Sequence, residues 1–142
     1  TRYWRDWSSD VCSSDLVLCG GLPQLMESAF ETLVEAGFDP KMAFLECCYE
    51  AKTIIELWMK YGPHELTQRI SPTAFYGGLT RGHRIVSAQT KTEMKKILSE
   101  IQSGKFAESW KKEVANGEVA LLEERKRLKS SLFEKTYQDL PL

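Results

Sequence analysis

The segment from Pro40 to Tyr61 constrains the fold most strongly, because it reads as a helix that is apolar on nearly every side. At about 100° per residue, its polar stripe of Lys52 and Glu56 is narrow. Such a helix is typical of a protein interior, so we expect it to be buried. The apolar positions lie on two opposite faces, one formed by Ala43, Ile54 and Leu57 and the other by Phe44, Cys48, Ile55 and Met59.

Two glutamates, Glu46 and Glu50, interrupt this apolar helix. In an α-helix they lie about 40° apart on one face. Neighbouring ionised carboxylates repel each other and are costly to bury, so we expect a positive partner, and a divalent cation bound by both would serve. Two alternatives remain open: an Arg or Lys from elsewhere, and a solvated helix face of the kind that Glu31 and Glu35 suggest.

Length and composition fit one globular domain. The chain has 142 residues, 42% of them hydrophobic and 27% charged, with a net charge of -1. This near-neutral balance gives no signal for nucleic acid or for an anionic membrane. No apolar run reaches the roughly 18 residues of a membrane span, and no signal peptide is apparent. We therefore expect no nucleic-acid partner and no membrane association.

The four cysteines indicate a reducing compartment. Cys47 and Cys48 are neighbours and would point about 100° apart on a helix, which makes them, with Cys12 and Cys19, a poor disulfide framework. Reduced thiols favour a cytoplasmic location. Cys47 and Cys48 fit packed core thiols better than nucleophiles, because the sequence shows no base near them.

Residues 1–16 look foreign to the rest of the chain. The tripeptide Ser-Ser-Asp occurs twice, at positions 8–10 and 13–15, and two tryptophans lie there without periodic partners. The segment resembles translated sequencing-adapter DNA joined to an open reading frame. We predict that residues 1–16 are non-native, that residues 17–142 form the domain, and that its true N-terminal part is missing. Sequencing the genomic DNA upstream of Val17 tests this prediction.

Apolar residues recur with helical spacing from Gln24 onward, and no segment alternates with a period of two, so the predicted class is all-α. Residues 63–90 contain two prolines and three glycines and are predicted to be a long loop with at most short helices. Asp39 before Pro40 reads as a helix cap. Helices are predicted over residues 24–36, 40–61, about 90–103, 106–115 and 118–137, ended by Gly37, Gly62-Pro63, Gly104 and Asn116-Gly117.

Other chemistry is weakly represented. No glycine-rich phosphate loop is present, and His64 and His83 lack any spacing typical of a zinc site. Ser71 precedes Pro72 in the predicted loop and by itself fits a turn residue.

Several ordered motifs resemble the C-terminal domain of ketol-acid reductoisomerase. The similarity covers residues 17–110 well and the tail loosely. The motifs are Cys19-Gly20-Gly21, the run from Ala29 to Phe38, the pattern from Pro40 to Lys52 with Glu46 and Glu50, Ile70-Ser71, Ala74-x-Tyr76-Gly77, and the run from Glu100 to Ala107.

The resemblance implies a knotted helical domain of an enzyme of valine and isoleucine biosynthesis. That enzyme isomerises 2-acetohydroxy acids of the acetolactate type by alkyl migration, and then reduces them to 2,3-dihydroxy acids with NADPH and two Mg²⁺ ions. Glu46 and Glu50 match its second pair of metal ligands, and Ser71 matches a substrate-binding serine. In the family, these residues complete the active site of a dimer partner, so a homodimer or a higher homo-oligomer is implied.

The chain also departs from the family pattern. The family's first ligand pair falls at Asp10 and Ser14, but Asp10 lies in the segment predicted to be foreign and Ser14 is not a carboxylate. No nucleotide-binding domain is recognisable. We therefore expect a fragment that supplies metal and substrate ligands and is inactive by itself. The rival hypothesis is a non-catalytic helical interaction module in which Glu46 and Glu50 form a structural ion pair.

Overall fold

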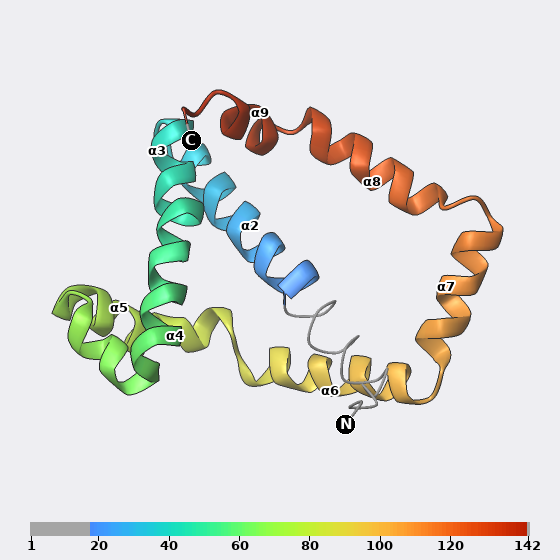
Figure 1. Cartoon of the computed structure of the whole chain (residues 1–142), viewed down its shortest axis with the longest axis horizontal. Helices are drawn as coiled ribbons and strands as arrows, with labels where there is room; N and C mark the ends of the chain where they lie inside the picture. Colours follow the sequence, from blue (N-terminus) through green and yellow to red (C-terminus); the bar gives the residue numbers. More distant parts are fainter. Residues whose placement is uncertain (1–17, 142) are drawn as a thin grey trace.

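A computed structural model describes residues 18–141, and the predictions made for residues 1–16, including Asp10 and Ser14, lie outside this range. The described chain contains helices and no strand, which confirms the all-α class (Figure 1). None of its helices is long and apolar enough to cross a membrane. The elements are α2 (Leu22–Glu35), α3 (Pro40–Phe44), the π-helical turn η2 (Leu45–Tyr49), α4 (Glu50–Arg69), α5 (Pro72–Ile85), α6 (Ala88–Gln102), α7 (Lys105–Ala115), α8 (Val119–Ser130) and α9 (Leu132–Gln138).

The helices form an open ring, with α2 running into its middle (Figure 1). α3, η2 and α4 form one continuous column, and α6, α7 and α8 form the opposite side of the ring. α9 closes the ring by packing against α2 and α3. Residues from opposite ends of the described chain therefore build its core.

The core is small and aromatic. Phe30 of α2 and Ala43 and Phe44 of α3 are buried. Phe133 of α9 lies with its ring centre 5.1 Å from those of both Phe30 and Phe44, and Tyr137 stacks 5.9 Å from Phe44. Aromatic pairs at these separations attract each other in addition to burying apolar area. The cluster fixes the point where the column begins.

The connection from α2 to α3 follows the sequence prediction. Gly37 has φ +91°, a conformation that favours glycine, and the Phe38 N–H donates to the Leu33 carbonyl to close the end of α2. The Asp39 carboxylate accepts from the Met42 N–H at 3.1 Å, so Asp39 caps α3 as predicted.

The predicted loop over residues 63–90 is wrong. Gly62, with φ +81° and ψ +167°, does break the helix where expected, but helical structure resumes at once and continues to Arg69. Pro63 and Pro72 each occupy a first helical turn. A backbone N–H at this position has no acceptor within the helix, so the missing N–H of proline costs no hydrogen bond. The two prolines therefore start helices, and the glycines of α5 lie inside a regular helix.

Two helix boundaries also differ from the prediction. α6 begins at Ala88, because the Ser87 hydroxyl caps it and Thr90 completes a capping box. The predicted helix 118–137 is divided at Ser131, where the backbone is extended and the Ser131 hydroxyl accepts from the Glu134 N–H at 3.1 Å. A serine that can cap the following helix offers the chain an alternative to continuing the first one.

The prediction of a buried helix is wrong for this chain by itself. Trp58 is 53% exposed and Met59 is 82% exposed, and no residue of α4 is buried. The reason is the open ring, which leaves this part of the column without a covering helix among residues 18–141 (Figure 1). The apolar surface that the sequence predicts is present, but within the described chain it faces outward.

Candidate functional site

The two glutamates singled out by the sequence lie at the π-helical turn of the column. Glu46 is within η2, and Glu50 follows it as the first residue of α4. The Glu50 N–H donates to the Leu45 carbonyl, five residues back. The 40° offset calculated for an α-helix therefore does not apply across this pair. Isolated π-helical turns are rare and occur frequently at functional sites.

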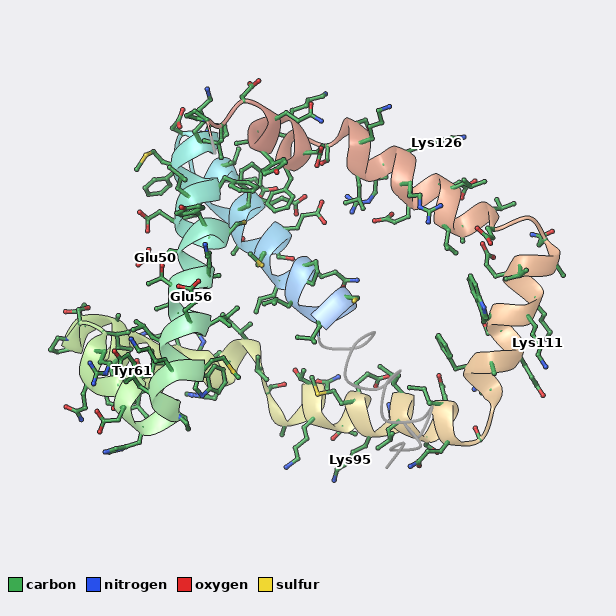
Figure 2. The ribbon with its side chains drawn as sticks, in the orientation of Figure 1. Glu50, Glu56, Tyr61, Lys95, Lys111 and Lys126 are labelled. Atoms are coloured by element: carbon green, nitrogen blue, oxygen red, sulfur yellow. The ribbon has the colours of Figure 1, made fainter. Side chains whose placement is uncertain are left out.

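The surroundings of the two carboxylates differ. Glu46 borders a hollow of about 390 Å³ whose other lining residues, Leu33, Phe38, Met42 and Ala43, are apolar. Glu50 projects from the column on the side away from α2 (Figure 2). Both side chains are exposed in the described chain, like Glu31 and Glu35. They are accessible to a ligand, and Glu46 lies next to apolar surface.

Neither glutamate is neutralised within the described chain. No Lys, Arg or His among residues 18–141 forms an ion pair with Glu46 or Glu50, whereas Lys52 lies 3.9 Å from Glu56 one turn further on. The structural ion pair of the rival hypothesis therefore does not form there.

Glu46 and Glu50 could supply part of the ligands of a magnesium site. No group of three or more His, Cys, Asp or Glu side chains in the described range converges to hold a metal ion. Mg²⁺ is commonly held by one or two protein carboxylates, with water and substrate oxygens completing its coordination. Glu46 and Glu50 lie four residues apart on one column and form no ion pair in the described range, so they are carboxylates of the kind that this role needs.

The thiols between the two glutamates are not activated. Burial raises the pKa of Cys48 to about 11, with a smaller contribution from Cys47, and Cys48 packs against the aromatic core. Burial, and secondarily the charge of Glu46, also raises the pKa of Cys47. A thiol with a raised pKa is a poor nucleophile near neutral pH, which agrees with the expectation that neither cysteine is a nucleophile. Of the two, Cys48 packs against the core as predicted.

Ser71 has a local structural role. Its hydroxyl oxygen accepts from the Ala74 N–H at 3.1 Å and caps α5. This bond uses the oxygen as an acceptor and leaves the hydroxyl proton available for donation. Ser71 forms no hydrogen bond with Glu46 or Glu50, so the described chain does not join the three predicted site residues into one cluster.

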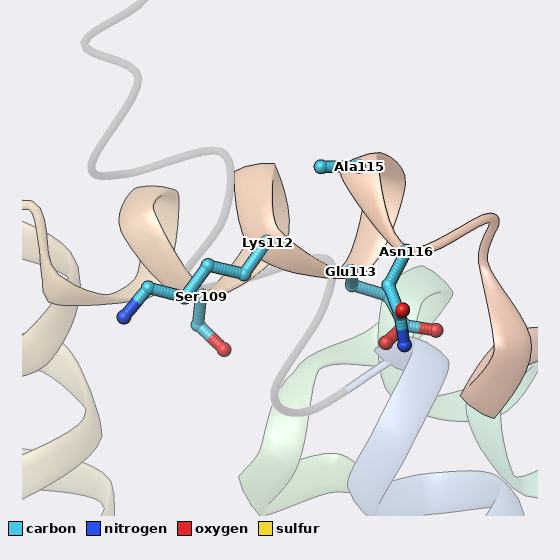
Figure 3. Close-up of a pocket in the computed structure, with 5 residues that line it drawn as sticks. All are labelled: Ser109, Lys112, Glu113, Ala115 and Asn116. Carbon is cyan, nitrogen blue, oxygen red and sulfur yellow. The ribbon is translucent and has the colours of Figure 1, made fainter.

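A second hollow, of about 570 Å³, lies at the end of α7 and is lined by Ser109, Lys112, Glu113, Ala115 and Asn116. Figure 3 shows the Glu113 and Asn116 side chains on the same side of the helix end. The Glu113 carboxylate accepts from the Ala120 N–H at 2.7 Å, so it caps the start of α8. Of the residues that line this hollow, Glu113 therefore has a structural role.

The sequence analysis missed one contact between distant helices. Arg127 of α8 binds Glu27 of α2, 100 residues away. The spacing of Glu124 and Arg127 predicts a pair within α8, whereas nothing in the sequence singles out Glu27 as the second partner.

Comparisons with known proteins agree with the fold and with the motifs. The family described as ketol-acid reductoisomerase, C-terminal domain, matches residues 5–141, and so extends into the segment that we predict to be non-native. A ketol-acid reductoisomerase (NADP(+)) from Methanocaldococcus jannaschii is 41% identical over 140 residues, which is 99% of this chain and 42% of that protein. The structure of an NADH-preferring ketol-acid reductoisomerase from an uncultured archean matches with a TM-score of 0.90 and 36% identity, over 93% of this chain and 40% of that one.

Proposed function

Because this chain belongs to the ketol-acid reductoisomerase family, whose C-terminal domain it matches, we propose that it supplies metal and substrate ligands to an enzyme that converts 2-acetohydroxy acids into 2,3-dihydroxy acids. The observation that carries the proposal is the family match together with two adjacent, exposed carboxylates that have no counter-ion in residues 18–141. The chain spans about two fifths of the length of the relatives it matches, so the remaining parts of the site lie elsewhere.

Glu46 and Glu50 are the residues that would hold Mg²⁺. When bound, the ion supplies Lewis-acid polarisation of the substrate's ketone and hydroxyl oxygens, which promotes alkyl migration. Each glutamate would contribute an anionic oxygen donor from the same column, Glu46 from η2 and Glu50 from the start of α4.

Ser71 would orient the substrate. Its oxygen accepts from the Ala74 N–H, which leaves the hydroxyl proton free to donate to a substrate oxygen.

The reductive half of the reaction needs a nucleotide that this chain has no motif to bind. We infer NADPH, held by an N-terminal domain of the complete enzyme. One relative is named for NADP(+) and another prefers NADH, so the choice of nucleotide belongs to this proposal. We expect the 142-residue chain by itself to be inactive, because it offers one carboxylate pair and no hydride donor.

The proposed partner is a second copy of the chain, in a homodimer or a higher homo-oligomer. The outward-facing apolar residues of α4 support this proposal, since exposed apolar patches of this kind mark interaction surfaces. A knotted arrangement and a cytoplasmic location also belong to the proposal.

The metal role is tested by Glu46→Gln in the complete enzyme. Loss of even an outer partner of a metal ligand costs 10–100-fold, so we expect isomerisation to fall by about 100-fold or more and the Mg²⁺ requirement to rise. Glu31→Gln, on an exposed face of α2, is the matched control and should leave both unchanged. Full activity of Glu46→Gln at low Mg²⁺ would contradict the assignment and favour the interaction-module alternative.

A further inference from the structure

The ion pair between Arg127 and Glu27 links α8 to α2 across the ring. Among the ion pairs of residues 18–141, Glu27–Arg127 joins the most distant segments, α2 and α8. Arg127 Nη1 and Nη2 donate to the two oxygens of Glu27 at 3.0 and 3.1 Å. Arg127 Nε and Nη2 also donate to Glu124 at 2.8–3.0 Å. One guanidinium therefore bridges a carboxylate on its own helix and a carboxylate on α2.

The geometry distinguishes this contact from an ordinary surface pair. Isolated surface ion pairs contribute little to stability, because water screens them and two flexible side chains must be ordered. Here two N–H groups of the guanidinium bind the two oxygens of one carboxylate, and the Glu27 side chain is 16% exposed although Arg127 is 49% exposed. Forked guanidinium–carboxylate bonds are stronger and more directional than single ones.

The rest of this side of the ring has few attachments. α6 packs with α7, and α8 packs with α9. α7 lies apart from the column and from α2 (Figure 1), and its apolar face is partly exposed at Phe106, Trp110 and Val114. At the far end, the start of α6 and the start of α2 line a shared apolar hollow of about 280 Å³. The segment α6–α8 is therefore an arm attached near its two ends.

We propose that Arg127 is the latch of this arm: its forked bond to Glu27 fastens α8 to α2. Release of the bond leaves α8 attached through α9, beyond the break at Ser131, and lets α7 and α8 swing outward. Glu124 holds the guanidinium in place from within α8 but does not cross the ring.

Amide hydrogen exchange of the 142-residue chain tests the latch with two matched substitutions. Glu27→Met removes the bond between the helices and keeps the Glu124–Arg127 pair, whereas Glu124→Met removes the pair within α8 and keeps the latch. We expect Glu27→Met to accelerate exchange in α7 and α8 by at least ~5-fold while exchange in α3 stays unchanged, and Glu124→Met to have a much smaller effect.

Two outcomes would overturn the latch. One is unchanged exchange in α8 of Glu27→Met, and the other is equal acceleration by both substitutions, which would indicate a local effect on helix stability. If Glu27→Met also accelerates exchange in α3, the experiment uses Arg127→Lys instead of Glu27→Met. Lysine keeps the positive charge but cannot form the two parallel bonds of the guanidinium to the carboxylate. Arg127→Lys should accelerate α7 and α8 and spare α3, and no acceleration in that variant would refute the proposal.

Discussion

Cys48 and Glu46 lie two positions apart in the π-helical turn and meet opposite environments. Cys48 packs against the aromatic core with Leu33 and Phe133, whereas Glu46 remains exposed beside an apolar hollow. The turn thus anchors one side chain while leaving a carboxylate free to bind. The anchoring residue and the candidate ligand are distinguished by the direction of the side chain and not by distance along the chain.

The burial of Cys48 predicts its reactivity. Because its pKa is raised to about 11, the thiolate is scarce at pH 8 and increases as the pH approaches 11. We expect iodoacetamide to modify the exposed Cys19 much faster than Cys48 at pH 8, with the Cys48 rate rising steeply between pH 8 and pH 10. Mass spectrometry of the labelled peptides measures both rates. Equal rates at pH 8 would show that Cys48 is not held in the core.

At the scale of elements, Gly62 decides how the column ends. Its backbone, with φ +81° and ψ +167°, lies in a region that is essentially restricted to glycine. Gly77 also sits among helical residues, in α5, but its φ is ordinary and a Cβ added there would meet open space. The backbone conformation therefore requires glycine at position 62, whereas position 77 could accept a side chain.

Alanine at these two positions should have opposite effects on stability. Gly62→Ala forces a side chain into the restricted region and should destabilise the chain by roughly 1–3 kcal/mol. Gly77→Ala lowers the entropy of the unfolded chain and suits a helix, so it should stabilise by about 0.4–1 kcal/mol. Urea unfolding followed by circular dichroism measures both. A stabilised Gly62→Ala variant would show that the break in α4 is not required.

At the scale of the whole molecule, the ring leaves much apolar surface uncovered. Ile55, Trp58 and Met59 of α4 and Phe106 and Trp110 of α7 are all more than two fifths exposed. The buried core consists of a few aromatic residues where α2, α3 and α9 meet. A chain of this size normally buries a larger core, so the missing cover is expected from a second copy.

Self-association of the chain is therefore expected. Sedimentation velocity at micromolar concentration should show a dimer or a larger species, and Trp58→Glu should weaken it by placing a charge on the apolar face of α4. Lys95→Glu on the exposed surface of α6 serves as the control. A clean monomer that binds no hydrophobic dye would show that the chain covers its own apolar faces.

The sequence by itself determined the helical class, the cap at Asp39, the breaks at Gly37 and Gly62, and Glu46 and Glu50 as an unusual acidic pair. These features depend on residues within a few positions of one another, where capping, backbone conformation and periodicity act. The tertiary structure decided that α4 faces outward and that Arg127 reaches Glu27. The physical reason is that burial and charge pairing depend on which distant helices meet, and local periodicity carries no information about those partners.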